Sequence, residues 1–211
     1  MPRDESAAIK QAQEWGYPIC VKSCTGTSSR NVNIVHEESQ LLECFHATPD
    51  AMLQKVFAEP SSDLGAEYTC SIFKAADGEM FGPFMARRTV RGGTSWLMEV
   101  DSYTELSAPL IDIASCIDFV GSLNIQLMLG EDGPVPFEIN ARFSGTTAVR
   151  AHFGFNEPDM ALRSFFFKQG IEKPSIRSGV VFRYNEEVFL DDVKADNLKV
   201  GHHFGAVNPW F

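Results

Sequence analysis

Apolar residues recur at helical spacing in four segments of the chain: 4–15, 37–46, 104–121 and 159–169. In the third segment the apolar side chains that share one face of the predicted helix are Leu106, Leu110, Ile113, Ile117 and Val120. The fourth segment follows Asn156 and Pro158 and stops at Gly170, which is the order expected of a cap, a first turn and a helix end. The pattern therefore predicts four helices.

Between these segments, apolar and polar residues alternate as they do in strands. Short strands are predicted in "YPICVKS" (17–23), "VNIV" (32–35) and "LQKVF" (53–57). Residues 67–88 alternate on both sides of an Asp-Gly turn, which indicates a hairpin, and "GVVFRYNEEVF" (179–189) alternates like a last strand or hairpin. Helices mixed with antiparallel hairpins favour an α+β architecture.

The most informative alternation is in "NIQLMLGEDGPVPFEIN", residues 124–140, where two segments flank a turn-rich "GEDGP". Asn124, Gln126 and Met128 share one face of the first segment, and Pro136, Glu138 and Asn140 share one face of the second. A hairpin symmetric about Asp132 pairs residue 126 with 138 and residue 124 with 140. Residues paired in this way have Cβ atoms ~4.5–5.5 Å apart, so the pattern predicts a cluster of side-chain oxygens.

Oxygen ligands with few carboxylates suit a hard cation such as Mg²⁺, or Mn²⁺ in its place, which keeps water and phosphate oxygens in its shell. Arg142, one step further along the strand, could then neutralise charge on a phosphoryl group in transfer. The same alternation is also typical of a strand edge that faces solvent. The pattern by itself leaves both interpretations open.

The composition of the chain limits the classes of molecule that it is expected to bind. The 211 residues, 44% of them hydrophobic, suffice for one substantial domain or two small lobes. A formal charge of −10, from 28 acidic and 18 basic residues, argues against nucleic acid or an anionic membrane as partner. The five cysteines form no CxxC pair and no apolar signal segment opens the chain, so reduced thiols in a cytoplasmic protein are expected.

Three stretches of the sequence, in their order and spacing, resemble a known protein family. "GYPICVKSCTGTSSRNV", then "LQKVF" with "EYTCSIF", and then "NIQLML" with "FEINARFSG" resemble successive parts of the ATP-grasp domain of the carbamoyl phosphate synthetase large subunit and biotin carboxylase type. The resemblance covers most of residues 2–170. It implies two α+β lobes that hold ATP between antiparallel sheets: residues 1–56 as the N-terminal lobe with the phosphate loop, and 57–211 as the C-terminal lobe with the metal and catalytic residues.

The resemblance also implies roles for residues that contact the nucleotide. Lys22 matches the basic residue that binds the ATP phosphates, and Gly26 and Ser28 lie in the loop that covers them, where only this one glycine of the usual set is present. The strand segment Gln54, Lys55 and Val56 matches the hinge whose backbone reads the adenine edge. Glu67 matches the acid that bonds the ribose hydroxyls.

The remaining roles concern the metal and the substrate. Gln126, Glu138 and Asn140 match the magnesium ligands, the first two also contacting the nucleotide, and Arg142 matches the catalytic arginine. Candidate substrate contacts from the residues themselves are the basic cluster Arg87, Arg88 and Arg91, together with Thr146 where the chain leaves the hairpin. A charged strand end followed by a turn explains the three arginines equally well.

The activity that the resemblance implies is that of an ATP-dependent, ADP-forming carboxylate–amine ligase. A small-molecule carboxylate is phosphorylated by ATP, and an amine or other nucleophile then attacks the acyl phosphate. Related enzymes place another domain before this point, so we expect either that this chain is a piece of a larger enzyme or that a partner domain or subunit completes the site. A homodimer is a further open alternative. The alternatives are a non-catalytic nucleotide-binding or scaffold domain and a kinase that phosphorylates a hydroxyl.

Overall fold

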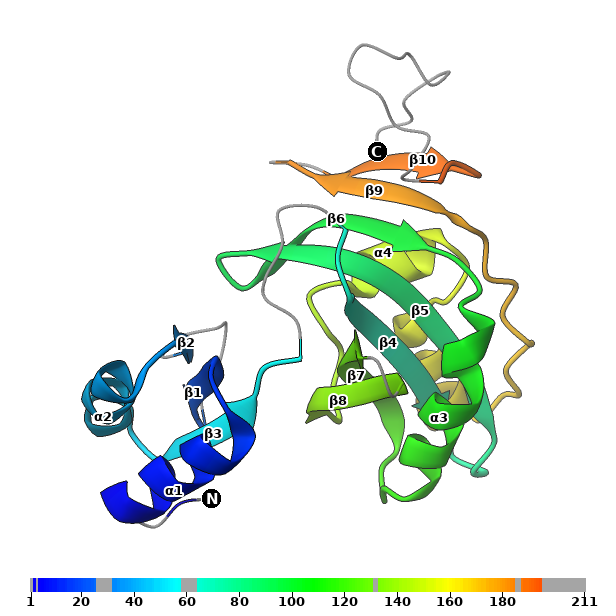
Figure 1. Cartoon of the computed structure of the whole chain (residues 1–211). Coiled ribbons are helices and arrows are strands. Elements are labelled where there is room, and N and C mark those ends of the chain that lie inside the picture. The colour runs from blue at the N-terminus through cyan, green and yellow to red at the C-terminus, as the bar shows by residue number, and fades with distance from the viewer. Residues whose placement is uncertain are drawn as a thin grey trace. The chain divides into compact units, whose positions relative to one another are not determined.

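The computed structural model describes residues 2, 4–25, 32–57, 64–130, 133–184 and 187–194. The chain divides into two compact units. One unit consists of Met1–Glu59 with Gly92–Thr94, and the other consists of Pro60–Arg91 with Ser95–Phe211. Each unit combines helices with antiparallel strands, so the predicted α+β class is confirmed (Figure 1).

The first unit is a small sheet with two helices. Its elements are α1 (Glu5–Trp15), β1 (Ile19–Ser23), β2 (Val32–Val35), α2 (Glu38–Ala47) and β3 (Ala51–Lys55), and the strand order is β2-β1-β3. Helix α1 begins where the Asp4 side chain accepts a hydrogen bond from the Ala7 amide and ends at Gly16, whose φ is 75°. The core lies between the helices and the sheet face that carries Ile19, Val21 and Leu53.

The second unit is built on a seven-stranded sheet of order β10-β9-β6-β5-β4-β7-β8. Its strands are β4 (Glu67–Lys74), β5 (Met80–Arg91), β6 (Thr94–Val100), β7 (Gly121–Gly130), β8 (Gly133–Asn140), β9 (Gly179–Arg183) and β10 (Glu187–Asp191). Its helical elements are α3 (Thr104–Ser115), α4 (Thr147–His152), α5 (Glu157–Ala161) and the π-helix η1 (Leu162–Phe167). The predicted hairpins around Asp77-Gly78 and within residues 179–189 are both present.

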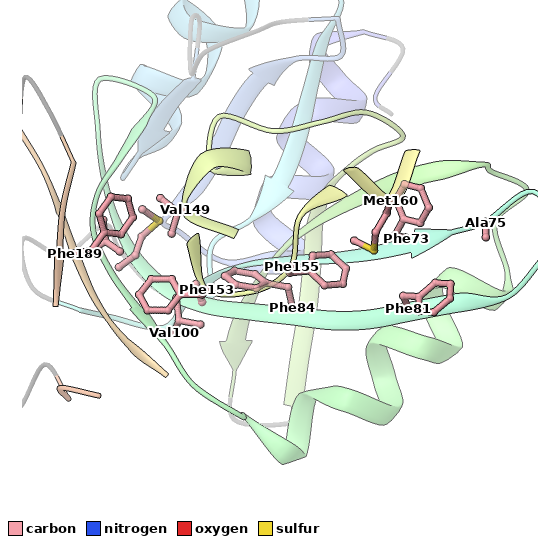
Figure 2. Packing of buried hydrophobic residues seen from close by; sticks show 13 residues of the cluster. Phe73, Ala75, Phe81, Phe84, Val100, Val149, Phe153, Phe155, Met160 and Phe189 are labelled. Carbon is pink, nitrogen blue, oxygen red and sulfur yellow. The ribbon is translucent and has the colours of Figure 1, made fainter. Parts of the chain in front are cut away.

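Both faces of this sheet are covered, and each cover makes a separate core. Helix α3 packs its buried Leu106 and Leu110 against one face, which carries Cys70 and Ile125. The segment α4–η1 packs against the other face, and Figure 2 shows its Phe153, Phe155 and Met160 beside residues of β4 and β5. Tyr68, Cys70 and Ile72 face α3, whereas Thr69, Ser71 and Phe73 face α4–η1, because side chains of a strand alternate.

Two helices differ from their predicted form. Helix α3 ends at Ser115 and does not reach residue 121, and Val120, which the pattern placed in the core, is 69% exposed. Phe119 is buried there instead, and only a chain that has left the helix brings Phe119 to the core. The last helix has its predicted Asn156 cap, but after Ala161 it continues as a π-helix and ends at the left-handed Lys168, two residues before Gly170.

Helix α4, six residues that begin at Thr147, is not evident in the periodicity because it is too short to show a repeat. No helix within the described ranges is long and apolar enough to cross a membrane.

Candidate functional site

The β7–β8 hairpin has the register that its polar pattern predicts. Gln126 lies directly opposite Glu138, and Asn124 lies opposite Asn140. The side-chain amide Nε2 of Gln126 donates to Oε1 of Glu138 at 3.2 Å, and Nδ2 of Asn140 donates to the same oxygen at 2.7 Å. Glu138 therefore lies between the two amides on one face of the sheet. The three residues predicted to hold the metal are brought together.

A β-bulge directly adjoins this cluster. The register shifts after the pair Gln126–Glu138, so that Pro136 lies opposite Leu127. The face that the alternation predicted for Pro136 together with Glu138 therefore does not continue past the bulge. Bulges bend a strand locally and re-aim its side chains. The carboxylate of Glu138 stays exposed, whereas Leu127 beside it belongs to the core under α3.

The cluster extends across the sheet through Arg88 on β5. Its guanidinium donates to Oε1 of Glu67 from Nε at 2.9 Å and from Nη2 at 2.7 Å. Nη2 also donates to Oε1 of Gln126 at 2.8 Å, and Nη1 donates to Ser95 Oγ at 3.0 Å. A row of hydrogen-bonded side chains thus crosses five neighbouring strands, from β6 through β5, β4 and β7 to β8. We call it the polar row, and its members are Ser95, Arg88, Glu67, Gln126, Glu138 and Asn140.

The three arginines predicted as one basic cluster are not brought together. Arg87 precedes Arg88 in β5, so its side chain emerges from the opposite face, where Nη2 pairs with Glu99 Oε2 at 2.7 Å. Burial acts to lower the pKa of the Arg87 guanidinium, but the hydrogen bond and charge of Glu99 outweigh it and the pKa is raised. Arg91 lies at the end of the strand, with its guanidinium carbon 5.7 Å from the centre of the Trp96 ring.

Arg142 and Thr146 follow the hairpin. Arg142 is exposed, its backbone amide donates to the carbonyl of Asn140 at 2.9 Å, and its side-chain Nη1 donates to the Phe143 carbonyl at 3.0 Å. Thr146 is buried, with its hydroxyl 2.8 Å from that of Ser144. Arg142 therefore lies next to Asn140, at the end of the polar row. Thr146 belongs to the turn that begins α4.

The polar row has the chemistry of a site for a hard cation. Its oxygen donors are the carboxylates of Glu138 and Glu67 and the side-chain amides of Gln126 and Asn140. In the part of the chain that the structure describes, no three His, Cys, Asp or Glu side chains gather as a metal cluster. A sparse oxygen set of this kind suits Mg²⁺, whose remaining positions are filled by water and phosphate oxygens. The exposed Glu138 is the carboxylate of the set that is open to such an ion.

Sequence reasoning missed a buried polar cluster that continues the same sheet face. Arg150 of α4 and Glu157 of α5 are both 0% exposed, and Arg150 Nη1 lies 3.1 Å from Glu157 Oε2. Arg150 Nη2 donates to the side-chain oxygens of Asn124 and Thr69, and Ser71 Oγ donates to Glu157 Oε1 at 2.6 Å. Polar residues at alternate positions of β4 and β7 were the one signal of this cluster. Nothing in the pattern pointed to Arg150.

Charge and burial act against each other in this cluster. Burial lowers the pKa of the Arg150 guanidinium, and the charge of Glu157 opposes that shift. Burial also raises the pKa of the Cys70 thiol, on the opposite face of β4 under α3, to about 12, so this thiol is neutral at physiological pH. The cluster therefore holds one cation against one anion in a region with no access to water.

In the first unit, two of the predicted nucleotide contacts share a face. Lys22 lies opposite Met52 and Cys20 lies opposite Gln54, so Lys22 and Gln54 point away from the face that packs on the helices. Lys55 pairs with Ile19 and emerges on the other side, where its ammonium lies 5.8 Å from the Phe57 ring centre. Val56 directly follows β3. The predicted phosphate-loop residues Gly26 and Ser28 lie outside the described residues.

A family model for the "ATP-grasp in the biosynthetic pathway with Ter operon" matches residues 64–188. This match runs from β4 through β9 and ends at the start of β10, includes the entire polar row, and covers more than half of the chain. The chain belongs to this ATP-grasp family. No curated protein matches it.

Solved structures share the fold at low sequence identity. The biotin carboxylase domain of 2-oxoglutarate carboxylase from Hydrogenobacter thermophilus, in complex with MgADP, ADP and bicarbonate, superposes with a TM-score of 0.68 at 14% identity, covering 87% of this chain and 45% of that one. Carboxyaminoimidazole ribonucleotide synthase from Aspergillus clavatus, in complex with ATP, gives 0.68 at 17% identity, covering 85% and 49%. N5-carboxyaminoimidazole synthetase from Staphylococcus aureus, in complex with ADP, gives 0.69 at 14%, covering 87% and 50%. The chain spans about half the length of these proteins.

Proposed function

We propose that this chain is the ATP-binding part of an ADP-forming carboxylate–amine ligase of the carbamoyl phosphate synthetase and biotin carboxylase type. The observation that carries the proposal is the hydrogen-bonded set Gln126, Glu138 and Asn140 on one face of the hairpin, followed at once by Arg142. Membership of an ATP-grasp family and a fold shared with nucleotide-bound enzymes support it. The proposed cofactors are ATP and Mg²⁺, or Mn²⁺ in its place.

Each residue of the site has a proposed role. Glu138 and Asn140, with Gln126, would hold the metal ion, which supplies charge neutralisation to the ATP phosphates when it is bound. Glu67 would accept hydrogen bonds from the ribose, Lys22 would bind phosphate, and the backbone of Gln54, Lys55 and Val56 would read the adenine edge. We propose that Arg88 orients Glu67 and Gln126, because its side chain is 11% exposed and donates hydrogen bonds to both of them.

The proposed reaction has two steps. An oxygen of the substrate carboxylate attacks the γ-phosphorus, the bond to the β-phosphate oxygen breaks, and ADP leaves. The lone pair of an amine then attacks the acyl carbon, the acyl–oxygen bond breaks, and inorganic phosphate and a proton are released. Arg142 is exposed and next to the polar row, where a guanidinium can stabilise charge on the transferring phosphoryl group. Arg91 stays a candidate contact for the anionic substrate.

The experiment compares Glu138→Ala with Glu172→Ala, which removes the same charge from another exposed position. Titration of the full chain with ATP, with and without Mg²⁺, should show a metal-dependent gain in affinity for the wild type and Glu172→Ala, and none for Glu138→Ala. Candidate carboxylates should stimulate release of phosphate, and hydroxylamine should trap an acyl phosphate. Wild-type metal dependence in Glu138→Ala contradicts the metal assignment.

A second candidate is a nucleotide-binding domain that is inactive unless a partner domain or subunit, or a second copy of this chain, completes the site. The observation that favours it is that the chain spans about half the length of the solved structures with this fold. Binding of MgATP without carboxylate-stimulated turnover would support it. Phosphorylation of a hydroxyl compound without hydroxylamine trapping would instead indicate a kinase.

A further inference from the structure

The buried pair of Arg150 and Glu157 lies on the same sheet face as the proposed metal site and contacts residues next to it. Arg150 is among the largest fully buried side chains of the described residues, and its Nη1 lies within 3.3 Å of both Glu157 oxygens. Its Nη2 donates to Asn124 Oδ1, to Thr69 Oγ1 at 3.2 Å, and to the carbonyl of Cys70 at 3.5 Å. The cation is thereby bound to both β4 and β7.

Stability of the fold does not account for such a pair. Moving two charges out of water costs several kcal/mol per ion, and apolar residues of similar volume often do as well or better in their place. Arg150 also keeps its Nε buried with no hydrogen-bonding partner among the described residues, which adds to that cost. The ring centre of Phe84 lies 5.8 Å from the guanidinium carbon, so an aromatic ring as well as polar groups borders the cation. A function that needs the pair explains its presence better than packing does.

The contacts of Arg150 lead to the metal-ligand face within two residues. Asn124, its partner on β7, lies directly opposite Asn140 and two positions from Gln126 on the same face. Thr69, its partner on β4, lies directly opposite Gln126 and donates to Asn124 Oδ1 at 3.2 Å. Arg150 therefore holds the strand segments on two sides of Gln126. Directly after Gln126 the register shifts before the ladder resumes at Leu127, so these side-chain contacts act next to a point where the backbone pairing is irregular.

We propose that Arg150 is a positioning residue for the metal site: paired with Glu157, it holds Asn124 and Thr69 so that Gln126, Glu138 and Asn140 present their oxygens to one ion. This inference rests on the proposed function. Residues that orient metal ligands from behind usually contribute 10–100-fold to metal affinity. Arg150 has no access to the ligand itself, because it is 0% exposed.

The test uses the full chain and the double variant Arg150→Met/Glu157→Gln, which removes both charges together and leaves no unpaired buried ion. Ser71 can still donate to the amide oxygen at position 157, and Asn124 still accepts from Thr69. The matched control is Arg163→Met/Asp159→Asn, which removes an exposed arginine–aspartate pair from the same helical segment. The readout is the factor by which Mn²⁺ raises the affinity for ATP, with the metal-free ATP affinity measured beside it.

The expected result is a double variant with a wild-type circular dichroism spectrum and metal-free ATP affinity, in which the Mn²⁺ factor falls by about 10–100-fold. The control should keep the wild-type factor. A folded double variant with an unchanged Mn²⁺ factor overturns the inference and leaves the proposed function standing. Absence of any Mn²⁺ effect in the wild type overturns both.

A second variant covers a failure to fold. Asn124→Leu keeps the branched outline of the side chain and the Arg150–Glu157 pair, and removes the two hydrogen bonds that Asn124 Oδ1 accepts from Arg150 and Thr69. If the double variant does not fold, the inference predicts that Asn124→Leu loses the Mn²⁺ factor while its metal-free ATP affinity stays unchanged. A wild-type factor in Asn124→Leu contradicts the inference.

Discussion

One sheet face carries two arginine–glutamate pairs in very different surroundings. Arg150 and Glu157 are both 0% exposed under the α4–η1 segment, whereas Arg88 and Glu67 are 11% and 22% exposed in the polar row. The first pair lies beside Asn124 and the second beside Gln126, two positions along β7. The same chemical pair therefore serves as an internal anchor where water is excluded and as part of an accessible site where the cover ends.

The largest effect is expected at the buried pair. Replacing Arg150 alone by Met leaves the Glu157 carboxylate buried without its cation, which typically costs about 3–5 kcal/mol. Urea denaturation should show a loss of this size in the free energy of unfolding. Adding Glu157→Gln to Arg150→Met should recover most of it, because no uncompensated charge is then left. A single variant as stable as the wild type would contradict the assignment of the pair as mutually dependent.

The next effect concerns chemistry at the exposed end. Arg142→Ala removes an exposed charge from the hairpin exit, so the fold and the ATP affinity should not change. If Arg142 stabilises the transferring phosphoryl group, acyl-phosphate formation should slow by about 10²-fold or more. Single-turnover measurement with radiolabelled ATP checks this. Arg177→Ala, another exposed arginine, provides the control, and equal rates for the two variants would count against the role of Arg142.

A smaller effect on stability is expected at the partly exposed pair. Arg88→Met removes charge-assisted hydrogen bonds to Glu67 and a hydrogen bond to Gln126, contacts worth about 1.5–3 kcal/mol in general. Because water reaches both side chains, the loss should fall near the lower limit. Urea denaturation measures it. Arg91→Met is the control, and a loss as large as that of Arg150→Met would remove the contrast between the two pairs.

The smallest effect is expected for a pair that lies fully at the surface. Arg163 and Asp159 are bonded at 2.7 Å across one helical turn, with about half of each side chain exposed. Exposed pairs of this kind contribute little to folding because water solvates the separated charges almost as well. Arg163→Met should leave the thermal midpoint unchanged. A marked fall in the midpoint would show that exposure does not set the order of these effects.

The hairpin register is the part of the site that could be predicted from the sequence. Side chains in a strand repeat every two residues, so a register shifted by one residue would put Gln126 on the face opposite Glu138 and Asn140. The same rule separates Arg87 from Arg88, although a cluster of like charges suggested one site. The bulge after Gln126 was not predictable, because a one-residue shift leaves no clear mark in alternation.

The buried residues beside the site could not be predicted at all. Arg150 lies in a six-residue helix, too short to show a period, and its partners Thr69 and Asn124 lie 81 and 26 positions away. Likewise, the periodicity of residues 104–121 extended the helix through Val120, although the core takes Phe119 instead. In each case the deciding contacts are made between distant segments.

The sequence by itself determined the α+β class, the two main hairpins and the polar face of β7 and β8, because turns and alternation act over a few neighbouring residues. Only the tertiary structure decided which polar residues of that face are buried and which are open to solvent. That division depends on where α4–η1 covers the sheet. Where the cover excludes water, an unpaired charge costs far more free energy than it does at the surface.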